Sequence, residues 1–164
     1  MTGKSPRRLG IHRPVSKDQR TCLPLEETLL PQYLARSGYQ PLMVGKWHLG
    51  HYTPDYFPQA RGFEHFYGHV TGGIGYWDHN HGGGHDWQRN GQTIREEGYS
   101  TRLLADEAIR VLESRDRSRP TVFYVAFNAP PLPHHAPAES IADHAPNDAG
   151  NRGQPTAMWG APDG

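Results

Sequence analysis

A short apolar run, Leu42–Val44, leads directly into Gly45-Lys46-Trp47-His48, and this junction constrains the fold more than any other stretch. The run is typical of a buried strand. In an open parallel sheet, ligands bind at the carboxyl ends of the strands, and a Lys with a His suits an oxyanion such as sulfate or phosphate. Lys46 and His48 are therefore the candidate catalytic residues. The alternative is a loop in which Lys46 is solvated and His48 packs locally.

This strand, predicted over 42–46, follows a predicted helix over residues 28–37. Pro31 is tolerated in the first turn of that helix, and Gly38 supplies its stop signal. We expect its apolar face to consist of Leu29, Leu30, Tyr33 and Leu34. Helix and strand together make one α–β unit.

A second unit is predicted between residues 100 and 127. Ser100 or Thr101 can cap its helix, and the run Ser114–Pro120 ends it. The expected apolar face of the helix consists of Leu104, Ala108, Val111 and Leu112. The apolar run Thr121–Phe127 is predicted to be a central parallel strand buried on both faces. Two such units predict an α/β fold.

Residues 51–98, between the two units, are rich in Gly and His and are predicted to form a long loop. Its candidate metal ligands are Asp78, His79, His81, His85 and Asp86. No predicted helix fixes these side chains, and the glycines beside them are expected to leave them unordered. A substrate-facing or solvated loop is the favoured interpretation, and a metal site is the alternative.

Composition limits the size of the core and the classes of partner. The chain has 164 residues, 35% of them hydrophobic, with 19 Gly and 15 Pro, which predicts one domain with a thin core. The formal net charge is zero, so no overall field favours nucleic acid or a membrane surface. One cysteine excludes an internal disulfide. We expect no membrane span and no signal peptide, and the compartment stays unassigned.

Several motifs in collinear order resemble those of the type I sulfatases, the arylsulfatase branch of the alkaline phosphatase superfamily. Gly38–Gly50 is similar to the second signature of that family. The other matching segments are Leu23–Thr28, Arg61–Gly68, Trp87–Gly91, Glu97–Thr101 and Phe127–Pro130. The resemblance implies a partial alkaline-phosphatase/sulfatase-like sheet with flanking helices over residues 1–140. Residues 141–164 are expected to be a disordered tail.

The resemblance also implies hydrolysis of an aryl or carbohydrate sulfate ester. In that family a cysteine oxidised to formylglycine attacks sulfur, a calcium ion polarises the sulfate, and the residues matching Lys46 and His48 stabilise the developing charge. Thr2-Gly3-Lys4 looks like the close of the first signature, which would put the nucleophile roughly eight residues upstream. Cys22 is a poor substitute, because Glu26 stands where the family needs an arginine. We expect a buried or idle thiol there.

Further departures from the family pattern predict a fragment that is inactive alone. Pro131 replaces a family histidine, and neither His134 nor His135 can be assumed to substitute for it. The calcium ligands have no counterpart, so we expect the chain to bind no calcium by itself. The alternatives are a non-enzymatic binder of sulfated glycans and a His-rich metal-binding protein. Loss of the first family strand would leave the strands over 42–46 and 121–127 with exposed edges and the chain marginally stable.

Overall fold

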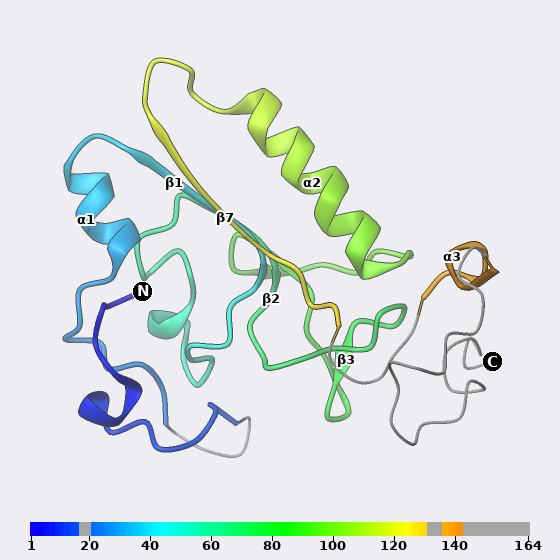
Figure 1. Cartoon of the computed structure of the whole chain (residues 1–164), viewed down its shortest axis with the longest axis horizontal. Helices are drawn as coiled ribbons and strands as arrows, with labels where there is room; N and C mark the ends of the chain where they lie inside the picture. The colour runs from blue at the N-terminus through cyan, green and yellow to red at the C-terminus, as the bar shows by residue number, and fades with distance from the viewer. Residues whose placement is uncertain (17–20, 131–135, 143–164) are drawn as a thin grey trace.

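The computed structural model describes residues 1–16, 21–130 and 136–142. Its long elements are two helices and three strands, with short strands and turns between them (Figure 1). The helices are α1 (Leu30–Arg36), α2 (Ser100–Ser114) and α3 (Ala138–Ala142), with 3-10 turns η1 (Pro6–Leu9) and η2 (Pro54–Tyr56). The strands are β1 (Gln40–Lys46), β2 (His65–His69), β3 (Asn80–His81), β4 (Gly84–His85), β5 (Gln88–Arg89), β6 (Gln92–Thr93) and β7 (Thr121–Ala126).

The main sheet has the order β6-β5-β2-β1-β7. Its long strands β2, β1 and β7 are parallel, and the antiparallel hairpin β5–β6 extends the sheet beyond β2. β3 and β4 form a separate two-stranded hairpin. Because the three parallel strands end at one edge of the sheet, loops from distant parts of the chain meet there. The predicted α/β architecture is confirmed.

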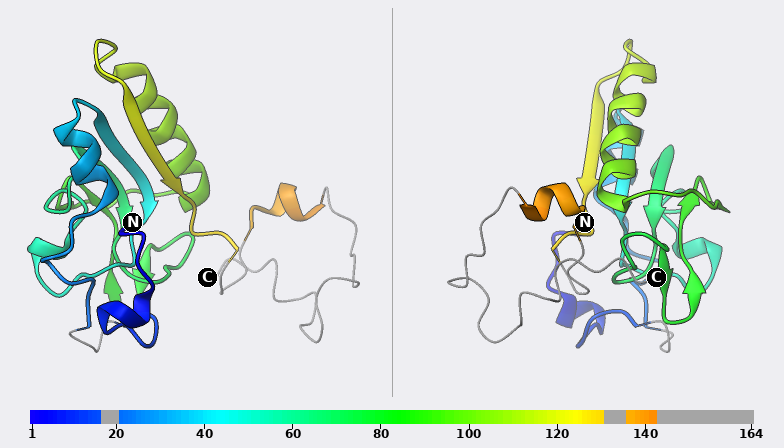
Figure 2. Two further views of the ribbon diagram at one scale, coloured as in Figure 1. Left: turned by 60° about the vertical axis from the view of Figure 1, so that its left-hand side comes forward. Right: turned by 90° about the vertical axis from the view of Figure 1, so that its right-hand side faces the viewer.

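The core lies on both faces of β1, whose interior residues are buried. Alternate residues of a strand point to opposite faces. Met43 packs with Leu29, Phe63 and Phe66 in one cluster, whereas Val44 packs with residues that include Leu104 of α2 in the other. Figures 1 and 2 show α1 and α2 on opposite sides of these strands. The single apolar run of β1 therefore supports two thin layers of packing.

The predicted apolar face of the first helix is wrong in part. α1 is shorter than the predicted range 28–37, and Leu29 precedes it as the N-cap residue, fully buried. Leu30 and Tyr33 are 51% and 57% exposed. Pro31, at the start of the helix, is buried instead. The buried contacts of α1 are therefore made at its N-terminal end, by Leu29 and Pro31, because a helix this short buries only a narrow stripe of side chains.

The second helix also departs from its prediction at two points. It begins at Ser100, so that residue does not cap it, and the N-cap residue Tyr99 makes no side-chain capping hydrogen bond. Leu104 and Val111 are buried as expected, whereas Leu112 is 38% exposed. The buried face includes a carboxylate, Glu107, which forms ion pairs with Arg110 and with Arg89 at 3.2 Å. One of its oxygens also lies 2.8 Å from Nε2 of His65, whose pKa burial lowers. A buried charge requires such partners, and they come from β2 and β5 as well as from the helix.

The prediction that Thr121–Phe127 is a central strand buried on both faces is wrong for the described chain. β7 pairs only with β1 and lies at the edge of the sheet, and Tyr124, Val125 and Phe127 are 41%, 37% and 44% exposed. A continuous apolar run shows that both faces of a strand are apolar. Whether helices or other strands cover those faces depends on the position of the strand in the fold. Of the two exposed edges expected from the family resemblance, only that of β7 is found. The prediction is wrong for the strand over 42–46, because β1 lies between β2 and β7.

The domain boundary predicted at residue 140 falls within α3. The tail prediction for residues 143–164 and the question about Pro131, His134 and His135 lie outside the described residues. Within the described part of the chain, no helix combines the length and apolar character needed to cross a bilayer.

Candidate functional site

Two glycines bring the parallel strands close together just before they end. Gly45 of β1 and Gly68 of β2 are partners in the sheet register, and Gly45 also faces Ala126 of β7. A Cβ atom at Gly45 would lie 1.9 Å from the carbonyl oxygen of Ala126, and one at Gly68 would lie 2.2 Å from the carbonyl oxygen of Gly45. Both glycines have positive φ, of 112° and 141°. Only glycine fits both the conformation and the space.

Lys46 and His69 follow these glycines and end their strands side by side. They are register partners on parallel strands, so both side chains leave the same face of the sheet. Burial lowers the pKa of Lys46 from its ordinary value, because a desolvated ammonium loses hydration. His69 was not among the residues predicted from the sequence.

His48 lies two residues beyond β1 in a left-handed conformation, with φ of 55°. A non-glycine residue there costs of order 1 kcal/mol and persists where surrounding contacts fix it. One contact is Nε2, which lies 2.8 Å from the carbonyl oxygen of Val15. A carbonyl oxygen only accepts, so Nε2 carries the proton and Nδ1 carries the lone pair of the neutral ring. Gly72 makes room for the ring, since a Cβ there would lie 2.6 Å from Nε2.

The environment of His48 disfavours its charged form. Burial lowers its pKa below the ordinary value, and the nearby charge of Lys46 acts in the same direction, while the hydrogen bond to Val15 opposes them. Lys46 and His48 are therefore close enough to interact electrostatically. A bound anion would reverse this balance, because it favours the cationic forms of both groups.

His69 is fully buried, and burial lowers its pKa to about 4, with Lys46 adding to the shift and Asp86 opposing it. Its Nδ1 lies 3.1 Å from the carbonyl oxygen of Thr71, so Nδ1 donates and Nε2 is the bare acceptor. Nε2 has no hydrogen-bond partner among the described residues. At neutral pH this ring is thus an uncharged acceptor beside a cation.

Asp86 organises the turn that follows β2. Its carboxylate accepts from the backbone N–H of Thr71 at 2.8 Å, from that of Val70 at 3.1 Å, and from the hydroxyl of Thr71 at 2.5 Å. These donors occupy the oxygens that the metal interpretation of Asp86 requires. The residue holds the loop around His69 in place instead.

The glycine- and histidine-rich loop is ordered, which corrects the prediction that flanking glycines leave its histidines unordered. His79 is fully buried and stacks on Trp87, with ring centroids 4.5 Å apart. His79 and His85 donate to the carbonyl oxygens of Gly98 and Ile94, at 3.1 and 2.7 Å. Short strands and aromatic packing supply the order that no helix provides.

The described residues do not fit a metal ion. Within residues 1–16, 21–130 and 136–142, no three His, Cys, Asp or Glu side chains gather closely enough to hold one. Asp78 is engaged by Asn80, whose backbone and side-chain nitrogens lie 3.2 and 2.9 Å from its oxygens. Those residues therefore contain neither a His-rich metal cluster nor a carboxylate cage of the kind that holds calcium.

Two other predicted positions have clear locations. Asn128, just beyond β7, is buried, and its Nδ2 donates to the carbonyl oxygen of Ile74 at 3.4 Å. It lies at the same carboxyl edge of the sheet as Lys46, because β1 and β7 are parallel. Cys22 is a free and buried thiol, which confirms its predicted burial.

Chemically, this edge can hold a tetrahedral anion. It presents the partly desolvated ammonium of Lys46 and the half-buried imidazole of His48. The neutral, buried imidazole of His69 lies beside Lys46. The residues missed by sequence reasoning are His69 and the Val15 carbonyl, which fix the surroundings of Lys46 and His48. The β-prone aromatic stretch His65-Phe66-Tyr67 was a signal for β2 and hence for the placement of His69.

Comparison with known proteins gives a consistent result. A family model described as Sulfatase matches residues 1–153. Mouse arylsulfatase J is 36% identical over 146 residues, which cover 84% of this chain and 24% of that protein. The uncharacterized sulfatase YdeN of Escherichia coli is 32% identical, with 84% and 28% covered. The chain thus spans about a quarter of the length of these curated relatives.

Solved structures agree in fold. The crystal structure of Ps i-CgsB in complex with k-i-k-neocarrahexaose has a TM-score of 0.79 and 27% identity, covering 87% of this chain and 36% of that one. A structure in complex with its substrate D-glucosamine-2-N,6-O-disulfate has a TM-score of 0.63 and 30% identity, covering 85% and 25%. The glycine-lined strand ends and the Lys46–His48 pair thus occur on a fold shared with sulfatases, and this chain belongs to the sulfatase family.

Proposed function

We propose that this chain binds the sulfate group of a sulfated carbohydrate at the carboxyl ends of β1 and β2, as part of a sulfuric ester hydrolase. The observation that carries the proposal is the joint placement of Lys46, the last residue of β1, and His48, two residues further on, where the charge of Lys46 acts on the pKa of His48. Relatives named for N-acetylglucosamine-6-O and N-acetylgalactosamine-6 sulfates support a carbohydrate sulfate.

In this proposal Lys46 neutralises the anion and His48 responds to it. The neutral His48 ring uses its one proton to bond Val15, so it offers a ligand only a lone pair. Protonation adds a second N–H, at Nδ1, which can donate to a sulfate oxygen. Because burial and Lys46 lower the pKa of His48, sulfate binding should strengthen as the pH falls below the ordinary histidine range.

We further propose that the chain alone does not hydrolyse the ester. Its single cysteine, Cys22, is buried, and the position four residues on is Glu26, an acid. A buried structural thiol is generally inert as a nucleophile. Binding without turnover is the expected behaviour of the 164-residue chain.

The test uses the whole chain and D-glucosamine 6-O-sulfate. Calorimetry should detect binding that Lys46→Ala weakens by at least about tenfold, because loss of a charge-assisted contact costs roughly 1.5–3 kcal/mol. Lys4→Ala is the matched control, since that ammonium is exposed and held by Glu27 at 2.7 Å. Equal affinities of the parent and Lys46→Ala would refute the sulfate site. Release of 4-nitrophenol from 4-nitrophenyl sulfate, with calcium present, would refute the proposed inactivity.

A further inference from the structure

Lys46 and His69, the last residues of β1 and β2, each carry a hydrogen-bonding group that has no partner in the described chain. The Lys46 ammonium forms no ion pair or hydrogen bond with residues 1–16, 21–130 or 136–142. Nε2 of His69 is buried and has no hydrogen-bond partner there either. An ammonium has three donors, whereas an unprotonated imidazole nitrogen is an acceptor. The two groups are therefore complementary, and a buried acceptor that stays unbonded is costly.

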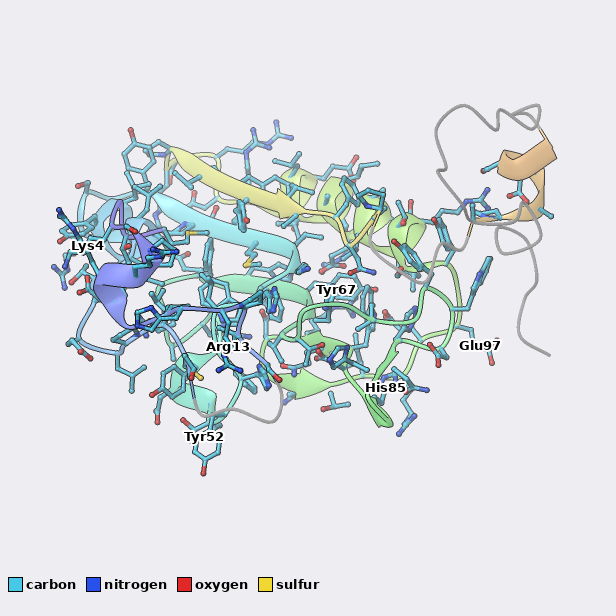
Figure 3. All side chains as sticks on the ribbon, turned by 60° about the horizontal axis from the view of Figure 1, so that its bottom comes forward. Lys4, Arg13, Tyr52, Tyr67, His85 and Glu97 are labelled. Atoms are coloured by element: carbon cyan, nitrogen blue, oxygen red, sulfur yellow. The ribbon has the colours of Figure 1, made fainter. Side chains whose placement is uncertain are left out.

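The sheet brings these two residues together. They are register partners on parallel strands, so their backbones are separated by one strand spacing, roughly 4.8 Å, and their side chains leave the same face. Gly45 and Gly68, one residue earlier on each strand, are also partners and let the backbones meet closely. Figure 3 shows β1 and β2 running in the same direction, with Tyr67 labelled two residues before His69. The ammonium and the imidazole therefore start from neighbouring points on one face of the sheet.

The other groups that act on the His69 ring are already engaged. Asp86, which opposes the lowering of the His69 pKa, accepts from the backbone N–H and the hydroxyl of Thr71. Nδ1 of His69 bonds the carbonyl oxygen of Thr71, which fixes the ring with Nε2 as the free acceptor. The neutral ring of His48, the third group that acts on His69, uses its one proton for a carbonyl oxygen. Among these described neighbours, Lys46 is the one with unused donors.

We propose that His69 is a positioning residue of the sulfate site: its Nε2 accepts a hydrogen bond from the Lys46 ammonium and sets the direction in which the other two ammonium protons meet the sulfate. This rests on the proposed function, in which Lys46 binds the sulfate. The two groups are unbonded in the structure, so the contact forms by a change of lysine rotamer while the sheet holds both backbones. Because the His69 ring is uncharged at neutral pH, it holds the ammonium without repelling it.

Two substitutions in the whole chain separate the roles of the two ring nitrogens of His69. His69→Asn keeps an N–H near the position of Nδ1, which can still bond Thr71, but has no acceptor near the position of Nε2. His69→Gln places a carbonyl oxygen near the position of Nε2. In calorimetry with D-glucosamine 6-O-sulfate, His69→Asn should bind about fivefold more weakly than the parent, whereas His69→Gln should stay within about twofold of it, because one hydrogen bond separates the two variants.

Nuclear magnetic resonance of Lys46 reports the contact without any ligand. The chain has three lysines, at positions 4, 17 and 46, so the side-chain signals of Lys46 are assigned by their loss in Lys46→Met. A hydrogen bond to a neutral acceptor favours the ammonium form of a lysine. The pKa of Lys46 should therefore be lower in His69→Asn than in the parent, and His69→Gln should restore it. A purely structural role of His69 would not order the two variants in this way.

A measurement that leaves His69 in place covers the case in which its variants do not fold. The nitrogen resonance of Nε2 moves when that atom accepts a hydrogen bond, so in Lys46→Met it should shift toward the value of a free, unprotonated imidazole nitrogen. Lys4→Met is the matched control, because Lys4 is exposed and held by Glu27, and it should leave the resonance unchanged. An Nε2 resonance that is identical in the parent and in Lys46→Met would overturn the contact.

Lys46→Ala separates this inference from the proposed function. If Lys46→Ala weakens sulfate binding while His69→Asn changes neither the affinity nor the pKa of Lys46, only the positioning role fails. Equal losses of affinity in His69→Asn and His69→Gln would also overturn that role, because both variants would then act through packing. If Lys46→Ala has no effect on the affinity, the sulfate site itself fails, and the positioning role fails with it.

Discussion

Val44 of β1 and Val125 of β7 are the same residue type on adjacent parallel strands, and they are partners in the sheet register. Val44 is fully buried, whereas 37% of Val125 is exposed. The two apolar runs look alike in the sequence. β1 has a strand on each side and a helix facing each layer, while β7 has one neighbouring strand in the described chain. Position in the sheet, and not strand composition, decides how much each residue stabilises the fold.

The largest effect is expected where β1 and β7 touch. Gly45→Ala places a Cβ atom 1.9 Å from the backbone oxygen of Ala126, and backbone cannot move aside as a flexible side chain can. We expect a loss above about 4 kcal/mol, or failure to fold. Gly38→Ala is the control, because Gly38 also has positive φ but open space around it, and it should cost only about 1 kcal/mol. Urea unfolding measures both, and similar losses would contradict the close approach.

The pH dependence of stability should originate on the β2 side of β1. β2 ends in His69, whose pKa is lowered to about 4 by burial, whereas β7 carries no group that titrates between pH 4 and 7. Below the ordinary pKa of 6.5 the unfolded chain binds a proton that the folded chain does not accept until the pH nears 4. Stability is therefore lost as the pH falls through this window, by up to roughly 3 kcal/mol.

His69→Gln removes this titration while keeping a hydrogen-bonding side chain. The slope of unfolding free energy against pH, taken between pH 4.5 and 6.5 by urea titration, should become shallower in the variant. An unchanged slope would mean that other buried histidines carry the effect. His65→Gln provides the comparison, since Glu107 opposes the downward shift of the His65 pKa that burial causes.

Substituting Val44 and Val125, which are partners in the sheet register, tests most directly whether position in the sheet decides how much a residue stabilises the fold. Val44→Ala should cost about 2 kcal/mol because it opens a cavity in a packed layer. Val125→Ala should cost less than about 1 kcal/mol, because much of that side chain already contacts solvent. The midpoints of urea unfolding report the difference. Equal costs would show that the outer face of β7 is covered in solution.

The smallest effect on stability is expected from Val125→Lys, at the exposed edge. We expect a change within about 0.5 kcal/mol and a lower tendency to self-associate, since a charge on an edge strand discourages edge-to-edge pairing. Light scattering at increasing concentration measures the second effect. Thr93→Lys on β6, the opposite and polar edge, should leave association unchanged. If Val125→Lys self-associates as much as the parent chain, then the β7 edge does not mediate association.

Local patterns in the sequence identified much of this fold and part of its site. The helix–strand spacing indicated parallel strands, and Gly-Lys-x-His after an apolar run indicated the carboxyl edge. The stretch His65-Phe66-Tyr67 could have indicated β2 and so the position of His69, but no sequence pattern shows that the His69 ring is buried beside Lys46. The same holds for the contact of Val15 with His48, which joins residues 33 positions apart through a backbone oxygen. The marginal stability of the chain stays a prediction.

By itself, the sequence determined the α/β class, the family, and the presence of a cation and an imidazole at a strand end, because each depends on short-range order along the chain. The tertiary structure alone decided that β7 is an edge strand, that His79 of the glycine-rich loop is buried against Trp87, and that the N-terminal arm reaches His48 through Val15. Burial and charge proximity depend on which distant segments cover one another. No periodicity within a single segment encodes that.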